Sequence, residues 1–166
     1  MRVIALVENT NIFKDYKSKH GLCLYIETKK HKLLFDLGSN SLFLGNAVKL
    51  VVDIWVIDSV IISHGHNDHG GALKYFLENN SKANIYISRY AFEEYYANFL
   101  GMKWYVGLDR KLKDNPRIIL IEDEYVIDEE LQIFSNIEEH RYLQTTVYSS
   151  NKMGRMSMIH LSMNNI

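Results

Sequence analysis

The sequence predicts a layered α/β domain, and three observations carry that prediction. The chain has 166 residues, a length typical of one domain with its own hydrophobic core. Short runs of β-branched and aromatic residues first follow one another closely and then alternate with segments of helical periodicity. The run Ser59–Ser63 (SVIIS) is too short for a helix and is rich in β-branched residues, which indicates a buried strand.

The N-terminal segments predict strands that pair locally. Arg2–Glu8 is a short β-type run, and the polar segment Asn9–Gly21 predicts a loop. Leu22–Thr28 (LCLYIET) and Lys32–Asp36 (KLLFD) predict a strand pair that is joined by a turn at Lys29–His31.

The middle of the chain predicts helices between strands. Ser41–Val51 carries apolar residues at helical spacing, and Ser41 suits the N-cap position of that helix. A helix over Gly70–Asn79 and a strand over Asn84–Ser88 follow the buried strand.

The remaining segments predict one more helix and two more strands. Ala91–Leu100 predicts an aromatic-rich helix, whose rings either pack in the core or form a wall on which a substrate stacks. Gly101–Asn115 predicts a loop-rich region. Two strands are expected over Arg117–Ile121 and Leu131–Phe134. The acidic segment Glu122–Glu130 between them predicts a turn.

The hydrophobic pattern fades at about Tyr142, and methionines cluster beyond it. We therefore expect a domain over residues 1–141 and an atypical C-terminal segment over residues 142–166.

Composition and charge argue against several classes of protein. The net charge of -1 disfavours broad nucleic-acid binding, because a phosphate-binding surface needs an excess of Lys and Arg. No run approaches the ~20 apolar residues of a membrane span, and the N-terminus lacks the features of a signal peptide. Cys23, expected in the core, is the single cysteine, which suits a reducing compartment. These observations predict a cytoplasmic protein with neither nucleic acid nor membrane as a partner. If the protein is an enzyme, the expected partner is a small-molecule substrate.

The segment ISHGHNDHGGAL concentrates metal-ligating side chains directly after the buried strand. Alternate residues of an extended chain point the same way, so His64 and His66 can face one metal ion. Asp68 and His69 can hold a second ion beside it. Imidazole and carboxylate ligands suit Zn²⁺, with Fe or Mn as alternatives. We expect one or two divalent ions, with Asp68 as the catalytic residue that orients a water or holds the second ion. The alternative is a solvated turn without metal.

This motif resembles that of the metallo-β-lactamase-fold superfamily. The upstream segment KLLFDLGSN is similar to a strand-plus-turn motif of the superfamily in which an aspartate supports the metal loop. Asp36 occupies that position, where the alternative is an ordinary strand-end turn residue. The resemblance implies that the chain is the N-terminal part of an αββα sandwich. It also implies hydrolysis of esters, amides or phosphodiesters at a dinuclear site.

The wider sequence is similar to the subfamily of dihydropterin ribofuranosylaminobenzene-phosphate synthases. VENTN, KSKHGLCLYIET, LLFDLGSNSLFLGNAVKL and the histidine motif follow one another between about Met1 and Tyr142. The subfamily implies a transferase that joins a pterin methyl carbon to an aminobenzene ribosyl phosphate and releases pyrophosphate.

The resemblance also implies metal ligands that are not visible in this sequence. The family has a further histidine in a Gly-Cys-Ser-His-like segment and another near its C-terminus. The downstream histidines here are His140, expected at the surface, and His160, a candidate replacement ligand. His20 and His31 are expected at the surface, with a substrate contact as an alternative for His20. A chain truncated at its C-terminus would leave an apolar sheet face uncovered, which favours a homo-oligomer.

Two functions follow. The first is a metal-dependent hydrolase-like enzyme that acts on a phosphate-containing or pterin-type substrate. The second is a truncated, catalytically silent remnant that lacks the downstream metal ligands.

Overall fold

The computed structural model describes residues 1–11 and 13–135 and, for the backbone alone, residues 159–163. The described residues contain one six-stranded sheet. Its strands are β1 (Arg2–Val7), β2 (Cys23–Glu27), β3 (Lys32–Phe35), β4 (Ser59–Ile62), β5 (Asn84–Ser88) and β8 (Ile118–Ile121). They lie in the order β1-β2-β3-β4-β5-β8. Strands β1 to β3 are antiparallel, whereas β3, β4, β5 and β8 are parallel.

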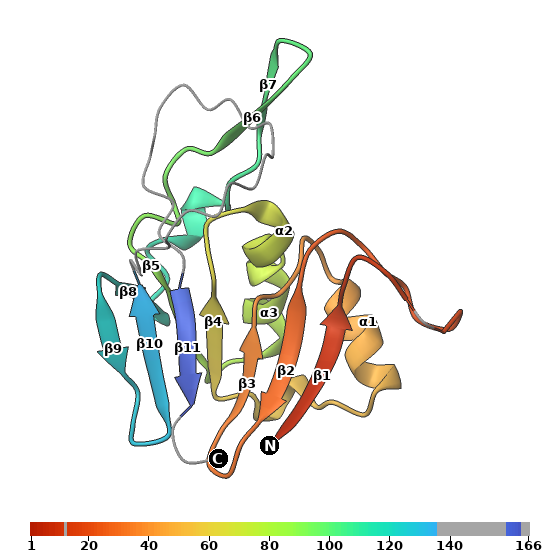
Figure 1. Cartoon of the computed structure of the whole chain (residues 1–166), viewed down its shortest axis with the longest axis vertical. Coiled ribbons are helices and arrows are strands. Elements are labelled where there is room, and N and C mark those ends of the chain that lie inside the picture. The colour runs from red at the N-terminus through yellow and green to blue at the C-terminus, as the bar shows by residue number, and fades with distance from the viewer. Residues whose placement is uncertain (12, 136–158, 164–166) are drawn as a thin grey trace, which may run out of the picture.

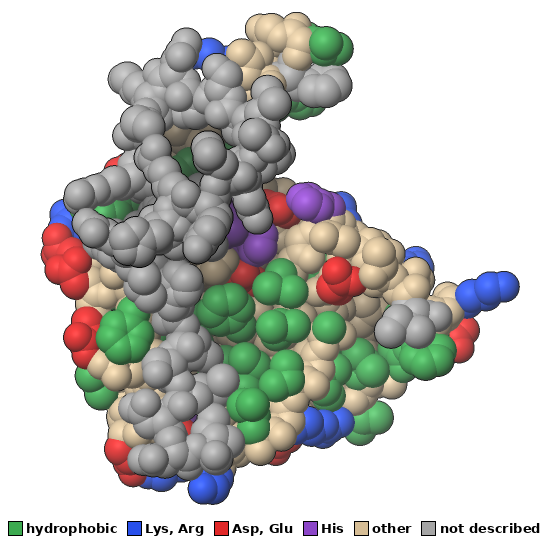
Figure 2. Space-filling view, in the orientation of Figure 1, with side chains coloured by type: hydrophobic (Ala, Val, Ile, Leu, Met, Phe, Trp, Pro, Cys, Tyr) green, Lys and Arg blue, Asp and Glu red, His purple; other side chains and the backbone are tan. Residues whose placement is uncertain are grey.

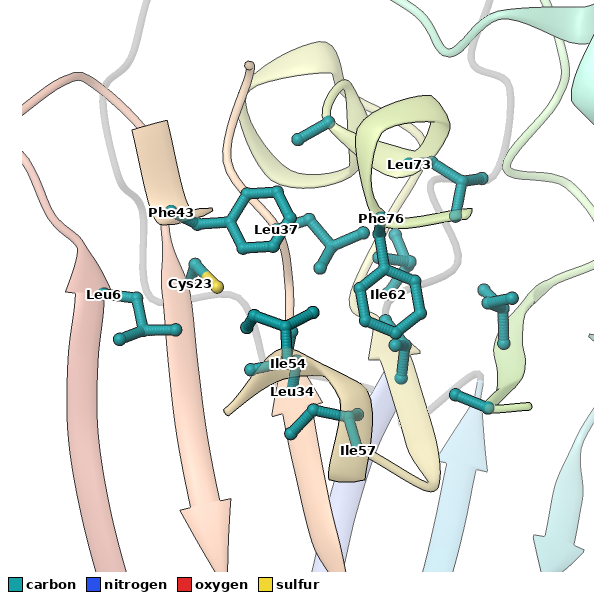
Figure 3. Packing of buried hydrophobic residues seen from close by; sticks show 14 of the residues in the cluster. Leu6, Cys23, Leu34, Leu37, Phe43, Ile54, Ile57, Ile62, Leu73 and Phe76 are labelled. Carbon is teal, nitrogen blue, oxygen red and sulfur yellow. The ribbon is translucent and has the colours of Figure 1, made fainter. Parts of the chain in front are cut away.

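Two helices cover one face of this sheet (Figure 1). The helical segments are α1 (Leu42–Lys49), α2 (Asn67–Gly70), α3 (Leu73–Asn79) and the single turns η1 (Ile54–Val56) and η2 (Arg110–Leu112). Phe43 of α1 and Phe76 of α3 are fully buried against Leu34 and Ile62 of the sheet (Figure 3). Cys23 lies in the same cluster, in agreement with its expected place in the core.

A second, smaller sheet covers part of the opposite face. Its described strands are β9 (Glu124–Val126), β10 (Leu131–Ser135) and β11 (Ile159–Met163), in the order β11-β10-β9. Because side chains alternate along a strand, Leu33 and Ile61 point away from the helices. They form a second buried cluster with Leu131 and Ile133 of β10. The layered α/β fold predicted from the sequence is therefore confirmed.

The expectation of an uncovered sheet face is only partly met. Beside the small sheet, Leu24 and Phe35 are half-buried against the second cluster, and Val3 is 50% exposed. Figure 2 shows hydrophobic side chains on this part of the surface.

The helix predicted over Ala91–Leu100 is wrong. The chain forms a turn there and continues into a hairpin of β6 (Tyr96–Phe99) and β7 (Met102–Tyr105), which projects from the molecule (Figure 1). Leu100 and Gly101 join the two strands and both have positive φ values, 50° and 80°. Two consecutive residues with positive φ form a tight turn whose twist matches that of the two flanking strands. The loop-rich region predicted over Gly101–Asn115 accordingly begins with a strand.

Two smaller predictions also need correction. Ser41 makes no side-chain capping bond, whereas Asn40 Oδ1 accepts from the backbone N–H of Leu42. The acidic turn after β8 contains β9. The C-terminal segment, which shows no periodicity, contributes β11 to the small sheet. His140 lies outside the described residues, as does most of the segment 142–166.

None of the helices in the described part of the chain combines the length and the apolar character that a bilayer crossing requires.

Candidate metal centre

The histidine cluster lies where two parallel strands end. Asp36 comes directly after β3, and one residue, Ser63, separates the end of β4 from His64. Because β3 and β4 are parallel neighbours, their carboxyl ends meet at one edge of the sheet, where open α/β sheets form their clefts. Figure 2 shows histidine and acidic side chains together at this end of the molecule.

The short helix α2 brings Asp68 and His69 back over the strand ends. The carbonyl oxygen of His66 accepts from the backbone N–H groups of His69 and Gly70 at 3.1 and 3.0 Å, which closes the turn. The N–H of Leu37 then donates to the carbonyl oxygen of His69 at 2.7 Å. This bond fixes α2 against the loop that follows β3.

Three of the side chains predicted as ligands converge. The ligand atoms of His64, Asp68 and His69 all lie within 4.8 Å of one another. The rings of His64 and His69 are 4.1 Å apart between centroids. The ring of His66 lies 4.8 Å from that of His64, but His66 is outside this mutually close group. The division of these ligands into one pair of histidines and a separate Asp68–His69 pair stays a prediction.

Asp36 connects the two closest histidines. Its side chain is fully buried, and its backbone has a positive φ of 58°, which is uncommon outside glycine. His69 Nδ1 donates to Asp36 Oδ2 at 2.7 Å. Ser63 Oγ donates to the same oxygen at 2.8 Å and lies 2.9 Å from His64 Nδ1. Since the Ser63 proton points to Asp36, the hydroxyl oxygen accepts from His64 Nδ1.

This network leaves the Nε2 atom of each histidine with a free lone pair. A ligating histidine in metalloproteins commonly donates its other ring N–H to a carboxylate or another oxygen. His69 has this arrangement directly through Asp36, and His64 has it through Ser63. The donor set therefore fits a divalent cation.

Electrostatics keep His64 neutral. Burial, followed by the neighbouring His69 and His66, lowers the pKa of His64 to about 3. Burial also lowers the pKa of His66. Burial opposes protonation of His69, but the hydrogen bond to Asp36 and the charges of Asp36 and Asp68 outweigh it and raise its pKa. At any pH at which the His69 ring is protonated, a metal ion must displace that proton in order to bind the ring.

Residues outside the motif support it, and sequence reasoning assigned most of them no role. Ser63 connects His64 to Asp36, and Tyr95 packs its ring 5.3 Å from that of His66. The loop between β1 and β2 contributes His20, which faces Asp68, and Asn9, which contacts the ring of His20. Of these residues, His20 was expected at the surface, with a substrate contact as the alternative, and Tyr95 belongs to the aromatic stretch predicted as a helix.

The structure also describes His31 and, for its backbone alone, His160. The backbone of His160 pairs with that of Phe134 in the small sheet, and its side chain is outside the described residues. His31 lies between β2 and β3, where it bonds Asp58 and Asp128 instead of standing free at the surface.

Two clefts open near the N-terminal loop. The smaller one is lined by the loop between β1 and β2 and by Asp68 and His69, so it leads to the cluster. The larger one, of about 310 Å³, lies between that loop and α1, and no histidine lines it. The smaller cleft, and not the larger one, therefore leads to the candidate metal ligands.

Comparison with known families agrees with this geometry. A family model described as the metallo-beta-lactamase superfamily matches residues 19–146. An uncharacterized protein of Methanocaldococcus jannaschii, MJ0448, is 31% identical over 143 residues. That match covers 82% of this chain and 54% of the relative.

Solved structures show the same fold. Tm1679, described as a metal-dependent hydrolase of the beta-lactamase superfamily, superposes with a TM-score of 0.63 at 27% identity. The match covers 80% of this chain and 47% of Tm1679. A quorum-quenching N-acyl homoserine lactone lactonase gives a TM-score of 0.51 at 16% identity and covers 69% of this chain and 49% of its own, which shows a shared fold alone. The chain spans about half the length of these relatives.

Proposed function

Because the chain belongs to the metallo-beta-lactamase superfamily, we propose that it is a metal-dependent hydrolase whose metal is held by His64, Asp68 and His69. The observation that carries this proposal is the convergence of these ligand atoms within 4.8 Å. The Asp36 network supports it, because Asp36 and Ser63 hold both imidazoles with their Nε2 atoms free.

When bound, the metal would act as a Lewis acid and would lower the pKa of a water molecule bound to it. The chain's own residues then have distinct tasks. His64 and His69 bind through neutral imidazole, and Asp68 adds the negative charge that a divalent cation requires. His66, beside His64, is the candidate ligand for a second ion. The cleft between His20 and His69 gives a substrate access to this edge of the sheet.

For the substrate, we propose a phosphate-containing or pterin-type compound. The motifs shared with the dihydropterin ribofuranosylaminobenzene-phosphate synthase subfamily support this class. So does Tyr95, an aromatic ring next to His66 on which a planar heterocycle can stack.

Metal analysis tests the proposal. The chain purified without added metal, and after zinc addition, should bind zinc at a fixed stoichiometry that His69→Ala removes. His31→Ala, which changes a histidine of the β2–β3 turn, should leave the stoichiometry unchanged. The zinc-loaded chain should hydrolyse a generic phosphodiester, and His69→Ala should not. A chain that takes up no zinc and shows no turnover would instead support the catalytically silent remnant.

A further inference from the structure

His20 reaches the candidate metal centre from a loop far away in sequence. Its Nε2 atom lies 3.2 Å from Asp68 Oδ2. The imidazole is 81% exposed, so it contributes little to the core. Asp68 Oδ2 is also 3.5 Å from His69 Nε2, so a single carboxylate oxygen lies between the two rings.

Asn9 fixes the orientation of the His20 ring. His20 Nδ1 lies 3.1 Å from Asn9 Oδ1, which also accepts from the backbone N–H of Gly21 at 3.1 Å. The second bond identifies the Asn9 atom that faces the ring as the oxygen. Both ring nitrogens of His20 therefore face oxygen atoms, and the Nε2 edge of the ring is directed at the Asp68 carboxylate.

The backbone beside His20 is packed directly onto Asp68. Gly21 has a φ of +126°, and a Cβ atom at this position would lie 2.0 Å from the carbonyl oxygen of Asp68. A side chain there would push the loop away. The sequence thus allows the His20 loop to come into contact with α2, and the contact forms one wall of the cleft.

We propose that His20 is a positioning residue that holds the Asp68 carboxylate in the orientation needed to bind the metal. The inference rests on the proposed metal site. An unrestrained carboxylate rotates about its terminal bond, whereas a close contact with an imidazole that Asn9 holds in place limits the directions that its oxygens can take. His20 is outside the group of ligand atoms that lie within 4.8 Å of one another, so it is not placed to share the ion that His64, Asp68 and His69 would hold. Outer contacts of this kind commonly change metal affinity by about 10–100-fold.

The test compares the zinc affinity of His20→Ala, His20→Gln and the wild-type chain by competition with a chromophoric chelator. The Gln amide can place an N–H near the position of the imidazole Nε2, so His20→Gln should bind zinc almost as tightly as the wild type. His20→Ala should bind about 10–100-fold more weakly. Its thermal unfolding midpoint without metal should stay unchanged, because the side chain is exposed. Asn9→Leu should weaken binding in the same direction.

The outcomes separate this inference from the proposed function. If the wild-type chain bound no zinc, both would be wrong. If it bound zinc and His20→Ala bound equally tightly, His20 would have no positioning role. Equal losses in His20→Ala and His20→Gln, with unchanged unfolding midpoints, would make His20 a direct ligand and would also overturn the inference.

Discussion

Asp36 and His69 form a buried carboxylate–imidazole pair at the end of β3, with 2.7 Å between Oδ2 and Nδ1. The pair engages Nδ1 of His69, so Nε2, which lies 3.5 Å from Asp68 Oδ2, is the nitrogen that can bind a metal ion. Because Asp36 also accepts from the backbone N–H and the hydroxyl of Ser63, one side chain orients both His69 and, through Ser63, His64.

We therefore expect Asp36→Asn to weaken zinc binding about 10–100-fold. The amide NH₂ would face His69 Nδ1, which would favour the tautomer whose proton is on Nε2 and thus block the free lone pair. Loss of the buried charged bonds should also lower the free energy of unfolding by about 1–3 kcal/mol. Chelator competition and urea unfolding measure the two effects. Asp58→Asn, which changes a carboxylate beside His31, is the control, and equal zinc affinity in Asp36→Asn and Asp58→Asn would refute the role of Asp36.

The close approach of Gly21 to Asp68 gives a second prediction. Gly21→Ala should destabilise the chain by about 1–3 kcal/mol, because the residue has a positive φ and its Cβ would collide with backbone. Zinc binding should weaken with it. Gly45→Ala is the matched control, since nothing lies within 4 Å of a Cβ there and alanine favours the helix α1. Thermal unfolding of both variants measures the difference, and two similar midpoints would contradict the prediction.

The contact between the two sheets gives a third prediction. Ile133 of β10 is fully buried against Leu33 and Ile61. Ile133→Ala should lower the free energy of unfolding by about 2–5 kcal/mol, because it removes buried methylene groups and leaves a cavity. Val126→Ala, on the neighbouring strand and 59% exposed, should change it by at most about 0.5 kcal/mol. Equal effects in urea unfolding would show that the small sheet does not pack stably on the large one.

Much of the large sheet was predictable because its signals are local. Ser59–Ser63 is short and β-branched, and the structure places β4 there. The placement of His64, Asp68 and His69 at the exit of that strand was predictable for the same reason. The close approach of His64 to His69 was not, since it depends on how α2 turns over the sheet.

The errors have physical causes. The rings of Ala91–Leu100 recur at spacings that fit a helix, yet aromatic residues also favour strands. The pair Leu100–Gly101, which turns the hairpin, contains a leucine at a positive φ that no local pattern indicates. The contacts of Ser63 and His20 join segments distant in sequence, so only the folded chain shows that they meet Asp36 and Asp68.

The ion pairs of His31 give a prediction about pH. His31 lies between Asp58 and Asp128, with Nδ1 3.2 Å from Asp58 Oδ1 and Nε2 2.8 Å from Asp128 Oδ2. Burial opposes protonation of His31, but the hydrogen bonds to Asp128 and Asp58 outweigh it, so its pKa is raised. The hydrogen bond from His31 lowers the pKa of Asp128 to about 2. Glu129 and Glu130 with Lys30 complete the charged surroundings.

The direction of the pH effect follows from these two shifts. Since the folded-state pKa of His31 is raised, its contribution is complete below the unfolded value of ~6.5 and is lost as the pH rises through the folded-state pKa. The contribution of Asp128 is complete above the unfolded value of ~3.9 and is lost as the pH falls toward the folded-state pKa. This contact between the β2–β3 turn and the β9–β10 turn should therefore be most stable between ~pH 4 and ~pH 6.5.

Urea unfolding of the wild type and His31→Gln at about pH 5.5 and pH 8.5, on either side of the unfolded histidine pKa, measures this effect. His31→Gln should lower the free energy of unfolding by about 1–2 kcal/mol at the lower pH, because the charged bonds are lost there. At the higher pH the deficit should be smaller, since the neutral imidazole has already lost part of its interaction with the two carboxylates. The difference in the free energy of unfolding between the wild type and His31→Gln excludes the titration of His64 and His69, because both proteins contain these two histidines. A deficit independent of pH would mean that His31 is not protonated in its ion pairs, and a deficit that grows with pH would reverse the sign of the shift.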